Sequence, residues 1–142
     1  MSQIYNESLP GNYSFVSRHD IKPEEIISLR ESVGWLGDTP ERWSIALEQS
    51  LDVIVVRSLT GDLVGMVCLA GNVRHAVMCD LVVHPDHQHQ GIGEALMAKL
   101  EQSLQTFNVT YVYAELAKTN PFREKMIRSG FVMTGESLFR AR

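Results

Sequence analysis

Two closely spaced glycines, Gly91 and Gly93, stand where a polar loop gives way to an amphipathic helical pattern. Glycine lets a backbone approach a ligand closely and adopt conformations that are closed to other residues. The first N–H groups of a helix have no partner inside the helix, and together with the helix dipole they form a site for phosphate. The chemistry that these residues predict is therefore phosphate binding by main-chain amides.

The sequence on either side of the loop can position it. The apolar run Val77–Val83 has the length and the branched side chains of a buried strand, and Pro85 ends it because proline has no N–H to donate. After the loop, apolar residues recur every four positions on one helical face, and they are Ile92, Leu96 and Leu100. The predicted order is strand, glycine loop and helix.

Known phosphate-binding patterns discriminate between possible ligands. Glu94 follows Gly93 where a P-loop needs lysine, and Leu96 stands where the dinucleotide fingerprint needs a third glycine. The string Gln88-His-Gln-Gly-Ile-Gly93, read as Gln/Arg-x-x-Gly-x-Gly/Ala, resembles instead the acetyl-CoA pyrophosphate loop of the GNAT acyltransferases. The preceding Leu81-Val-Val-His-Pro85 resembles the fourth strand of that family and its exit. The alternative is a structural turn that binds no ligand.

The resemblance implies an N-acetyltransferase that transfers the acetyl group of acetyl-CoA to a primary amine by direct attack, through a tetrahedral intermediate. Leu81 and Val83 would lend backbone groups to the pantetheine arm, and an amide near Val82 would stabilise the oxyanion. This requires the strand to separate from a neighbouring strand at 109–116, so that amides are left unpaired. The implied acetyl-CoA contacts are Leu81, Val82, Val83, Gln88, His89, Gln90, Gly91, Ile92, Gly93, Glu94 and Asn120.

A base must remove a proton from the amine before it attacks. Asp80 is the best-placed carboxylate, one residue before the expected pantetheine contacts, and Glu115 on the neighbouring strand is second. Strand alternation puts Asp80 on the face opposite Leu81 and Val83 unless a bulge turns it. A structural, hydrogen-bonded carboxylate is the equal alternative for Asp80.

The usual general acid of the family is missing from this chain. Many members carry a tyrosine four residues before a Gly-Phe pair, and Met126 stands there, or Arg123 if the alignment is shifted by one turn. Tyr111, Tyr113 or water could protonate the departing thiolate instead. The absent tyrosine favours a second hypothesis, in which the chain binds CoA with weak or no turnover. A third is an interaction domain with no cofactor.

Three histidines, His84, His87 and His89, lie close together near the glycine loop. They could form a metal site, but a position in the CoA loop explains them better, and we predict no metal. Protonated His87 or His89 would add attraction to the CoA phosphates below about pH 6.5.

Composition sets limits on partners and location. The 142 residues predict one domain over 1–142, and a net charge of -4 with no basic tract argues against nucleic acid and suits a cationic amine. Cys68 and Cys79, both in apolar runs, are expected to be buried thiols of a reducing compartment. With no leader and no apolar run near 18 residues, we expect a soluble cytoplasmic protein without membrane contact, and by family analogy a possible homodimer.

The remaining chain supplies the elements of the GNAT fold. Its patterns predict an α+β (mixed α/β) domain in the order β-α-α-β-β-β-α-β-α-β, with a central mixed, mostly antiparallel sheet and helices on both faces. The helical pair near the start borders the acceptor site in that family, where Trp35 and Trp43 could line the site or simply pack in the core. Val33-Gly-Trp35 adds a resemblance to the small bacterial and plant-plastid amine acetyltransferases. Strands are predicted at 12–16, 51–58, 63–70, 76–83, 109–116, 131–134 and 137–140, and helices at 23–34, 40–50, from the glycine loop onward, and 120–130.

Overall fold

The computed structural model describes residues 5–115, 120, 122–134 and 137–141. Within them a seven-stranded sheet has the spatial order β1-β2-β3-β4-β5-β7-β6. Its strands are β1 Tyr13–Val16, β2 Asp52–Ser58, β3 Leu63–Gly71, β4 His75–Val83, β5 Tyr111–Ala114, β6 Val132–Thr134 and β7 Ser137–Ala141. The helices are α1 Pro23–Glu31, α2 Pro40–Gln49, α3 Ile92–Thr106 and α4 Phe122–Arg128, with 3-10 turns at Arg18–Asp20 and Pro85–His87.

The sheet is mixed, as the sequence predicts. Strands β1 to β4 pair antiparallel in chain order, and β7 pairs antiparallel with both β5 and β6. Strands β4 and β5 run parallel, because α3 carries the chain back between them. The predicted mostly antiparallel α+β architecture is confirmed.

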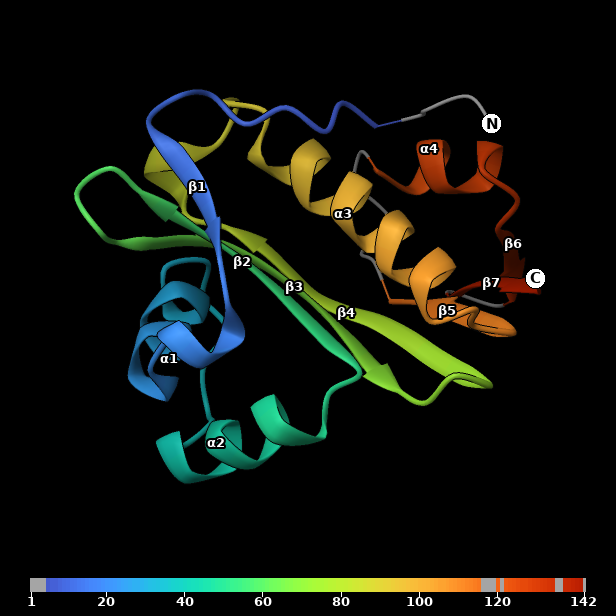
Figure 1. Ribbon diagram of the computed structural model, residues 1–142, viewed down its shortest axis with the longest axis horizontal. Helices are drawn as coiled ribbons and strands as arrows, with labels where there is room; N and C mark the ends of the chain where they lie inside the picture. Colours follow the sequence, from blue (N-terminus) through green and yellow to red (C-terminus); the bar gives the residue numbers. More distant parts are fainter. Residues whose placement is uncertain (1–4, 116–119, 121, 135–136, 142) are drawn as a thin grey trace.

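Helices cover both faces of the sheet, with α1 and α2 on one side and α3 and α4 on the other (Figure 1). Each face has its own core, because successive residues of a strand point to opposite sides. On β2, Val56 packs toward α3 and Val55 packs toward α1. None of the helices that the structure describes combines the length and the apolar character needed to cross a bilayer.

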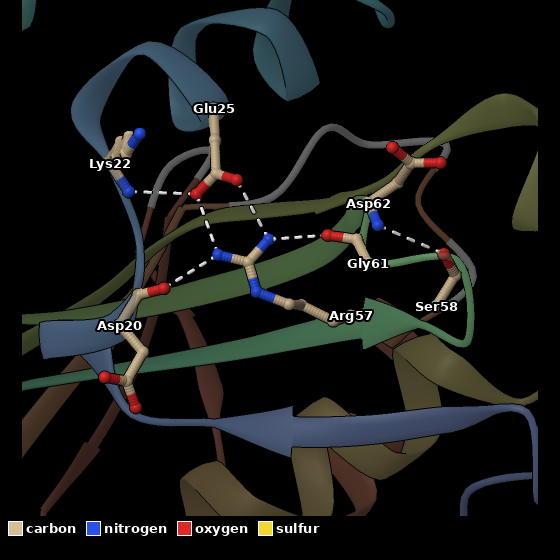
Figure 2. A network of polar contacts seen from close by, with 7 residues as sticks. All are labelled: Asp20, Lys22, Glu25, Arg57, Ser58, Gly61 and Asp62. Carbon is tan, nitrogen blue, oxygen red and sulfur yellow. Dashed lines mark hydrogen bonds and ion pairs between the residues drawn. The ribbon is translucent and has the colours of Figure 1, made fainter.

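The start of α1 is tied to the β2–β3 hairpin by Arg57 (Figure 2). Its guanidinium donates to both carboxylate oxygens of Glu25, at 2.9 and 2.8 Å, and to the carbonyls of Gly61 and Asp20, at 2.8 and 2.7 Å. The Lys22 N–H donates to the same carboxylate at 2.9 Å. The hydrogen bond from Arg57 holds the pKa of Glu25 below its ordinary value. This network fixes the start of α1 against the β2–β3 hairpin.

The end of α1 fixes the position of Trp35. Gly34 has a φ of +84°, and its N–H donates to the Glu31 carbonyl at 3.0 Å. The Trp35 N–H reaches back to the Arg30 carbonyl at 3.0 Å, which completes a Schellman motif. The predicted helix stop at Gly34 is confirmed.

The N-terminal segment packs more closely than its polar sequence predicts. Tyr5 is 2% exposed and its ring lies 6.0 Å from that of Phe122, while the Asn6 N–H donates to the Glu94 carboxylate at 3.1 Å. The segment runs over α3 toward α4 (Figure 1). Regular structure nevertheless begins only with β1, after residue 10 as predicted.

Strand β5 is shorter than the predicted 109–116. Asn108 takes a φ of +51°, and the Val109 N–H donates to the Leu104 carbonyl at 3.1 Å, so both residues close α3 instead of opening the strand. The predicted Gly130 stop of α4 is confirmed, since Gly130 has a φ of +110° and Phe131 is buried behind it. The predictions that fall on Leu116, Pro121 and the turn at 135–136 lie outside the described residues.

Candidate active site

A cleft of about 400 Å³ joins the start of α3, the second half of β4 and the end of α1. Its wall includes Val33 and Trp35 after α1, and Phe122 in α4. Most of the residues predicted to contact acetyl-CoA line it, and they are Leu81, Val82, Val83, Gln88, His89, Gly91, Ile92, Gly93, Glu94 and Asn120. Gln90 is exposed, and Asp80 is half-buried next to the cleft wall.

The glycine loop has the conformation that its sequence predicts. Gly91 caps α3 with a φ of +84° and accepts the Ala95 N–H at 3.1 Å. His89 also has a positive φ, at +64°. A Cβ on Gly93 would lie 3.0 Å from the Phe122 ring, so glycine keeps the helix start close to α4. The first amides of α3 have no partner inside the helix, and the two glycines put no side chain beside them. This arrangement suits a phosphate ligand.

The start of α3 also sits close to the sheet. A Cβ on Gly65 of β3 would lie 2.8 Å from Ile92 and 3.3 Å from Leu96. Gly65 pairs with Val83, so the same glycine brings the phosphate loop and the second half of β4 together. Sequence reasoning missed this residue, because a glycine within a strand pattern does not reveal which helix crosses it.

Strands β4 and β5 separate where the prediction requires it. Their parallel register ends at Met78 opposite Ala114, and the Glu115 N–H makes a last bond to the Met78 carbonyl at 3.2 Å. Strand β4 continues to Val83, still paired with β3. From Cys79 onward, no residue that the structure describes after Glu115 pairs with β4 on its β5 side, so within the described residues this edge of β4 is open.

Alternation decides which peptide groups face the opening. The His84 N–H donates to the Val64 carbonyl at 2.8 Å, and the Val82 amide, two residues earlier, points toward β3 in the same way. The peptide groups of Leu81 and Val83 therefore face the open side. These two residues flank Val82, so their amides fit the prediction of an oxyanion donor near Val82, which stays a prediction.

Asp80 lies on the face opposite Leu81 and Val83, as strand alternation predicts, although a bulge is present beside it. Cys79 pairs with Cys68 and Val82 with Met66, so two residues of β4 stand opposite one residue of β3. Asp80 has a φ of +56°, a conformation that L residues rarely adopt. The bulge puts the consecutive residues Cys79 and Asp80 on the α1 side, and Leu81 and Val83 pack toward α3. Asp80 contacts Arg30 of α1, on the opposite face.

Asp80 forms an ion pair with Arg30 through Oδ1 and Nη1. Burial raises the pKa of the Asp80 carboxyl above its ordinary value, and the charge of Arg30 opposes that rise only in part. The guanidinium carbon of Arg30 lies 5.2 Å from the Trp35 ring centre and 5.5 Å from that of Trp43. Sequence reasoning gave no role to Arg30, since a single arginine in the last turn of a helix usually reflects the helix dipole.

The two tryptophans occupy different environments. Trp43 is 6% exposed and belongs to the core beneath α1, with its Nε1 buried and without a hydrogen-bond partner among the described residues. Trp35 is 41% exposed and lines the cleft. Trp43 thus packs in the core, whereas Trp35 lines the cleft, and its place in an acceptor site stays a prediction.

The other acid and base candidates lie in less favourable places. Glu115 is exposed just after β5. Tyr111 and Tyr113 stack on His75 at the far end of β4, with ring centres 4.9 and 6.1 Å from it. Met126 is 1% exposed in the core. Arg123 is also buried, and none of the described residues that line the cleft is a tyrosine.

The histidines near the loop make local contacts. His87 lines the cleft, and its Nδ1 lies 2.8 Å from the Tyr13 hydroxyl. His84 accepts the Asp86 N–H at 3.1 Å, and His89 is exposed on the cleft wall. Over the described part of the chain, no group of three or more His, Cys, Asp or Glu side chains is arranged to hold a metal ion.

Solved structures share this architecture. A probable acetyltransferase from methicillin-resistant Staphylococcus aureus superimposes with a TM-score of 0.72 at 20% identity, over 87% of this chain and 92% of the other. The PaiA N-acetyltransferase of Thermoplasma acidophilum, solved with coenzyme A, gives 0.66 at 16% identity over 92% and 99%. N-acetylglutamate synthase of Neisseria gonorrhoeae, also solved with coenzyme A, gives 0.70 at 17% over 93% and 34%. These likenesses show the fold.

Sequence comparison gives the family. Two proteins named uncharacterized N-acetyltransferase ycf52 are similar, at 28% identity over 126 residues in Gracilaria tenuistipitata var. liui and 29% over 100 residues in Pyropia yezoensis. The alignments cover 84% and 68% of this chain but only 66% and 58% of those relatives. Residues 12–131 match the acetyltransferase (GNAT) family, which uses acetyl-CoA. With the glycine loop, the cleft and the open edge of β4 in place, the chain belongs to the GNAT acetyltransferase family.

Proposed function

We propose that this protein transfers an acetyl group from acetyl-CoA to a primary amine by direct attack of the amine. The observation that carries the proposal is one cleft that connects the first amides of α3 with the edge of β4 that no described strand covers after Met78. Phosphate would bind at the first position and the thioester would lie at the second. The acceptor would come from the other side of the sheet, past Trp35.

Each part of the cleft suits one part of acetyl-CoA. The amides between Gln88 and Gly93 would bind the pyrophosphate. The peptide groups of Leu81 and Val83 would pair with the pantetheine arm as a neighbouring strand does. The Gln88 side chain already donates to the Val83 carbonyl at 3.1 Å, which links the loop to the strand. When bound, acetyl-CoA supplies the acetyl group as a thioester.

The chemistry requires a base and an oxyanion site. The Asp80 carboxylate would take the proton that the ammonium form of the amine must lose, and its raised pKa makes it a stronger base than an ordinary carboxylate. The Leu81 amide would donate to the oxygen on which negative charge develops. A bond forms between nitrogen and carbonyl carbon, the carbon–sulfur bond breaks, the sulfur leaves as a thiolate, and the second proton of the nitrogen passes to water or to that thiolate.

The cysteines are poor candidates for an acetylated intermediate. Burial and the nearby Asp80 raise the pKa of the Cys79 thiol to about 12, and burial raises that of Cys68 as well. Only a thiolate is an effective nucleophile. Direct attack by the amine is therefore the simpler route.

A second candidate function is CoA binding with little or no turnover. The buried Met126 favours it, because it stands where many relatives carry the tyrosine that protonates the thiolate. A thiol with an ordinary pKa of about 8.5 can leave as thiolate at modest cost, so this substitution does not decide between the two functions.

One assay separates the candidates. The protein is incubated with acetyl-CoA and a panel of primary amines, amino acids and peptides, and release of free CoA thiol is followed. Amine-dependent thiol release supports the transferase. Thermal stabilisation by acetyl-CoA, about 2.7 kcal/mol at 100 times the Kd, without thiol release supports the binding module. If acetyl-CoA produces neither thiol release nor thermal stabilisation, both candidate functions are contradicted.

A further inference from the structure

Two arginine–carboxylate pairs hold α1 to the sheet, and they differ in how well the carboxylate charge is satisfied. Arg57 donates twice to Glu25, and the pKa of Glu25 lies below its ordinary value (Figure 2). Arg30 pairs with Asp80, yet the pKa of Asp80 lies above its ordinary value. Side-chain exposure is similar in the two pairs, at 18% and 32% in the first and 17% and 23% in the second. The Asp80 carboxylate is therefore the one that can readily take up a proton.

The Arg30 side chain is held from two sides. Its guanidinium lies near the rings of Trp35 and Trp43, at 5.2 and 5.5 Å, in the range of a cation–π contact. The carbonyl of Arg30 also accepts the Trp35 N–H at 3.0 Å, so the backbone turn that ends α1 places one ring against the guanidinium. Trp43 is fixed in the core. A guanidinium held this way offers a donor in a set direction.

Asp80 needs such a partner because its backbone conformation alone does not fix the orientation of its carboxylate. Its φ of +56° and the bulge around it put the carboxylate on the α1 side of β4, while the next residue, Leu81, turns its amide to the open edge. Arg30 is the cation that contacts this carboxylate. Positive-φ residues held by their surroundings are common at functional sites.

We propose that Arg30, held between Trp35 and Trp43, is a positioning residue that orients the Asp80 carboxylate beside the open edge of β4 to receive the proton of the amine. This inference rests on the proposed function. It assigns Trp35 two tasks, since the same ring lines the cleft and supports the guanidinium. The proton moves from the ammonium nitrogen to a carboxylate oxygen of Asp80, and the freed electron pair attacks the thioester carbon.

The groups around Asp80 set the expected direction of a pH effect. Arg30 lowers the pKa of Asp80, while Asp38 before α2 and Glu115 after β5 raise it. Cys79, beside it on β4, and Cys68 on β3 also interact with Asp80. Removal of the Arg30 charge therefore raises the pKa of Asp80 further, and the acid limb of kcat/KM must move to higher pH.

The test compares Arg30→Met, Trp35→Leu and the matched control Arg57→Met, each with melting temperature, acetyl-CoA Kd and a pH profile of kcat/KM. For Arg30→Met we expect kcat lower by about tenfold or more, an acid limb higher by about half a pH unit, and a Kd within about twofold. Trp35→Leu changes an exposed position and leaves the core intact. We expect it to lower kcat and to raise the acid limb as Arg30→Met does, but by smaller amounts. Arg57→Met lowers the melting temperature and leaves the acid limb in place.

An acid limb that does not move in Arg30→Met and Trp35→Leu would overturn the inference, as would the same shift in Arg57→Met. Full activity of Asp80→Asn would also overturn it, while acetyl transfer itself would stand. Wild-type protein that transfers no acetyl group to any amine would contradict the proposed function instead.

Discussion

Asp80 combines a positive φ, a raised pKa and an arginine partner at a single position of β4. The first two features have a cost to folding, since the backbone is strained and the charged carboxyl is partly desolvated, and the arginine offsets part of the second cost. The direction of the Asp80 pKa shift shows how this cost depends on pH. A carboxyl with a raised folded-state pKa stabilises the fold most below its unfolded pKa, and that contribution is lost as pH rises through the folded pKa. At neutral pH, Asp80 therefore weakens the fold, as residues in working sites often do.

Replacement of this carboxylate tests its role as a base. Asparagine tolerates the positive φ, so Asp80→Asn keeps the bulge and removes the proton acceptor. We expect kcat/KM to fall roughly 10²- to 10⁴-fold, with loss of the acid limb that wild type shows above the ordinary aspartate pKa of about 3.9. Steady-state kinetics between pH 5 and 9 measure this. Asp62→Asn, in the exposed β2–β3 turn, is the control, and an acid limb that survives in Asp80→Asn would refute the assignment.

Gly91 tests the loop separately from the chemistry. A Cβ there would contact nothing within 4 Å, so Gly91→Ala acts only through the φ of +84°. The left-handed conformation costs an L residue about 1–2 kcal/mol, which corresponds to roughly 5- to 30-fold weaker acetyl-CoA binding if the loop must relax. Calorimetric titration measures the Kd. Gly11→Ala, equally open but with no positive φ, should bind like wild type, and equal Kd values for the two variants would argue against the loop.

At the residue scale, local sequence motifs could be predicted, whereas contacts between distant residues could not. The glycines, Gln88 and Asn120 were predicted because their spacing is a local pattern, and the structure places them on the cleft. Arg30 lies 50 positions from Asp80, and no local pattern links them. The bulge at Asp80 was raised in the sequence only as a possibility, because it depends on how β4 pairs with β3.

The attachment of α3 to the sheet depends on the space left by Gly65. In Gly65→Ala the new Cβ would lie 2.8 Å from Ile92, so the first turn of α3 must shift. Overpacking of this size typically costs about 1–3 kcal/mol. We expect a lower melting temperature and weaker acetyl-CoA binding together, measured by calorimetry. A variant that loses stability but binds acetyl-CoA as wild type does would show that α3 docking and ligand binding are independent.

The tie between α1 and the β2–β3 hairpin predicts a pH effect of the opposite sign. The Glu25 pKa is depressed below 4.5, so its contribution to stability is present above that pH and is lost as pH falls through the folded-state pKa. Glu25→Gln should lower the free energy of unfolding by about 1 kcal/mol at pH 7 and flatten its decline in acid. Urea unfolding at pH 7 and pH 3 measures this, with exposed Glu24→Gln as control. An equally steep decline in Glu25→Gln would contradict the role.

At the element scale, the spacing of apolar residues and the prolines and glycines at helix ends predicted most of the helices and strands. Prolines opened α1 and α2, and Gly34 and Gly130 closed α1 and α4. The start of β5 was wrong by two residues, because Val109 has strong strand propensity but its N–H is used to cap α3. Burial of Tyr5 could not be predicted either, since its partner Phe122 lies far along the chain.

For the whole molecule, the site lies where two separate cores meet. Val82 packs in the core beneath α1, and its neighbours Leu81 and Val83 pack against α3, so the open edge of β4 is supported from both faces. The cleft correspondingly takes its wall from both sides, with Trp35 on one and the glycine loop on the other. Under the proposed function, acetyl-CoA and amine would approach from opposite faces, and a net charge of -4 would favour a cationic acceptor.

The mixed sheet and its two helical layers followed from the order of elements, since a helix between two strands makes them parallel. The point at which β4 and β5 separate did not follow from strand propensity. It depends on where the parallel register ends, at Met78 and Ala114, and on the bulge two residues later. Both are properties of strand pairing and not of either strand alone.

The central claim is that main-chain amides at the start of α3 bind the phosphates of CoA while those of β4 bind its arm. An NMR titration of ¹⁵N-labelled protein with CoA, and separately with pantetheine, reads these amides directly. We expect saturable shifts from Gln88 to Glu94 with CoA only, and shifts at Leu81 and Val83 with both ligands. The amide signals of the Thr60–Asp62 turn should not shift with either ligand. Saturation by CoA with the Gln88–Glu94 amides unmoved would contradict the account.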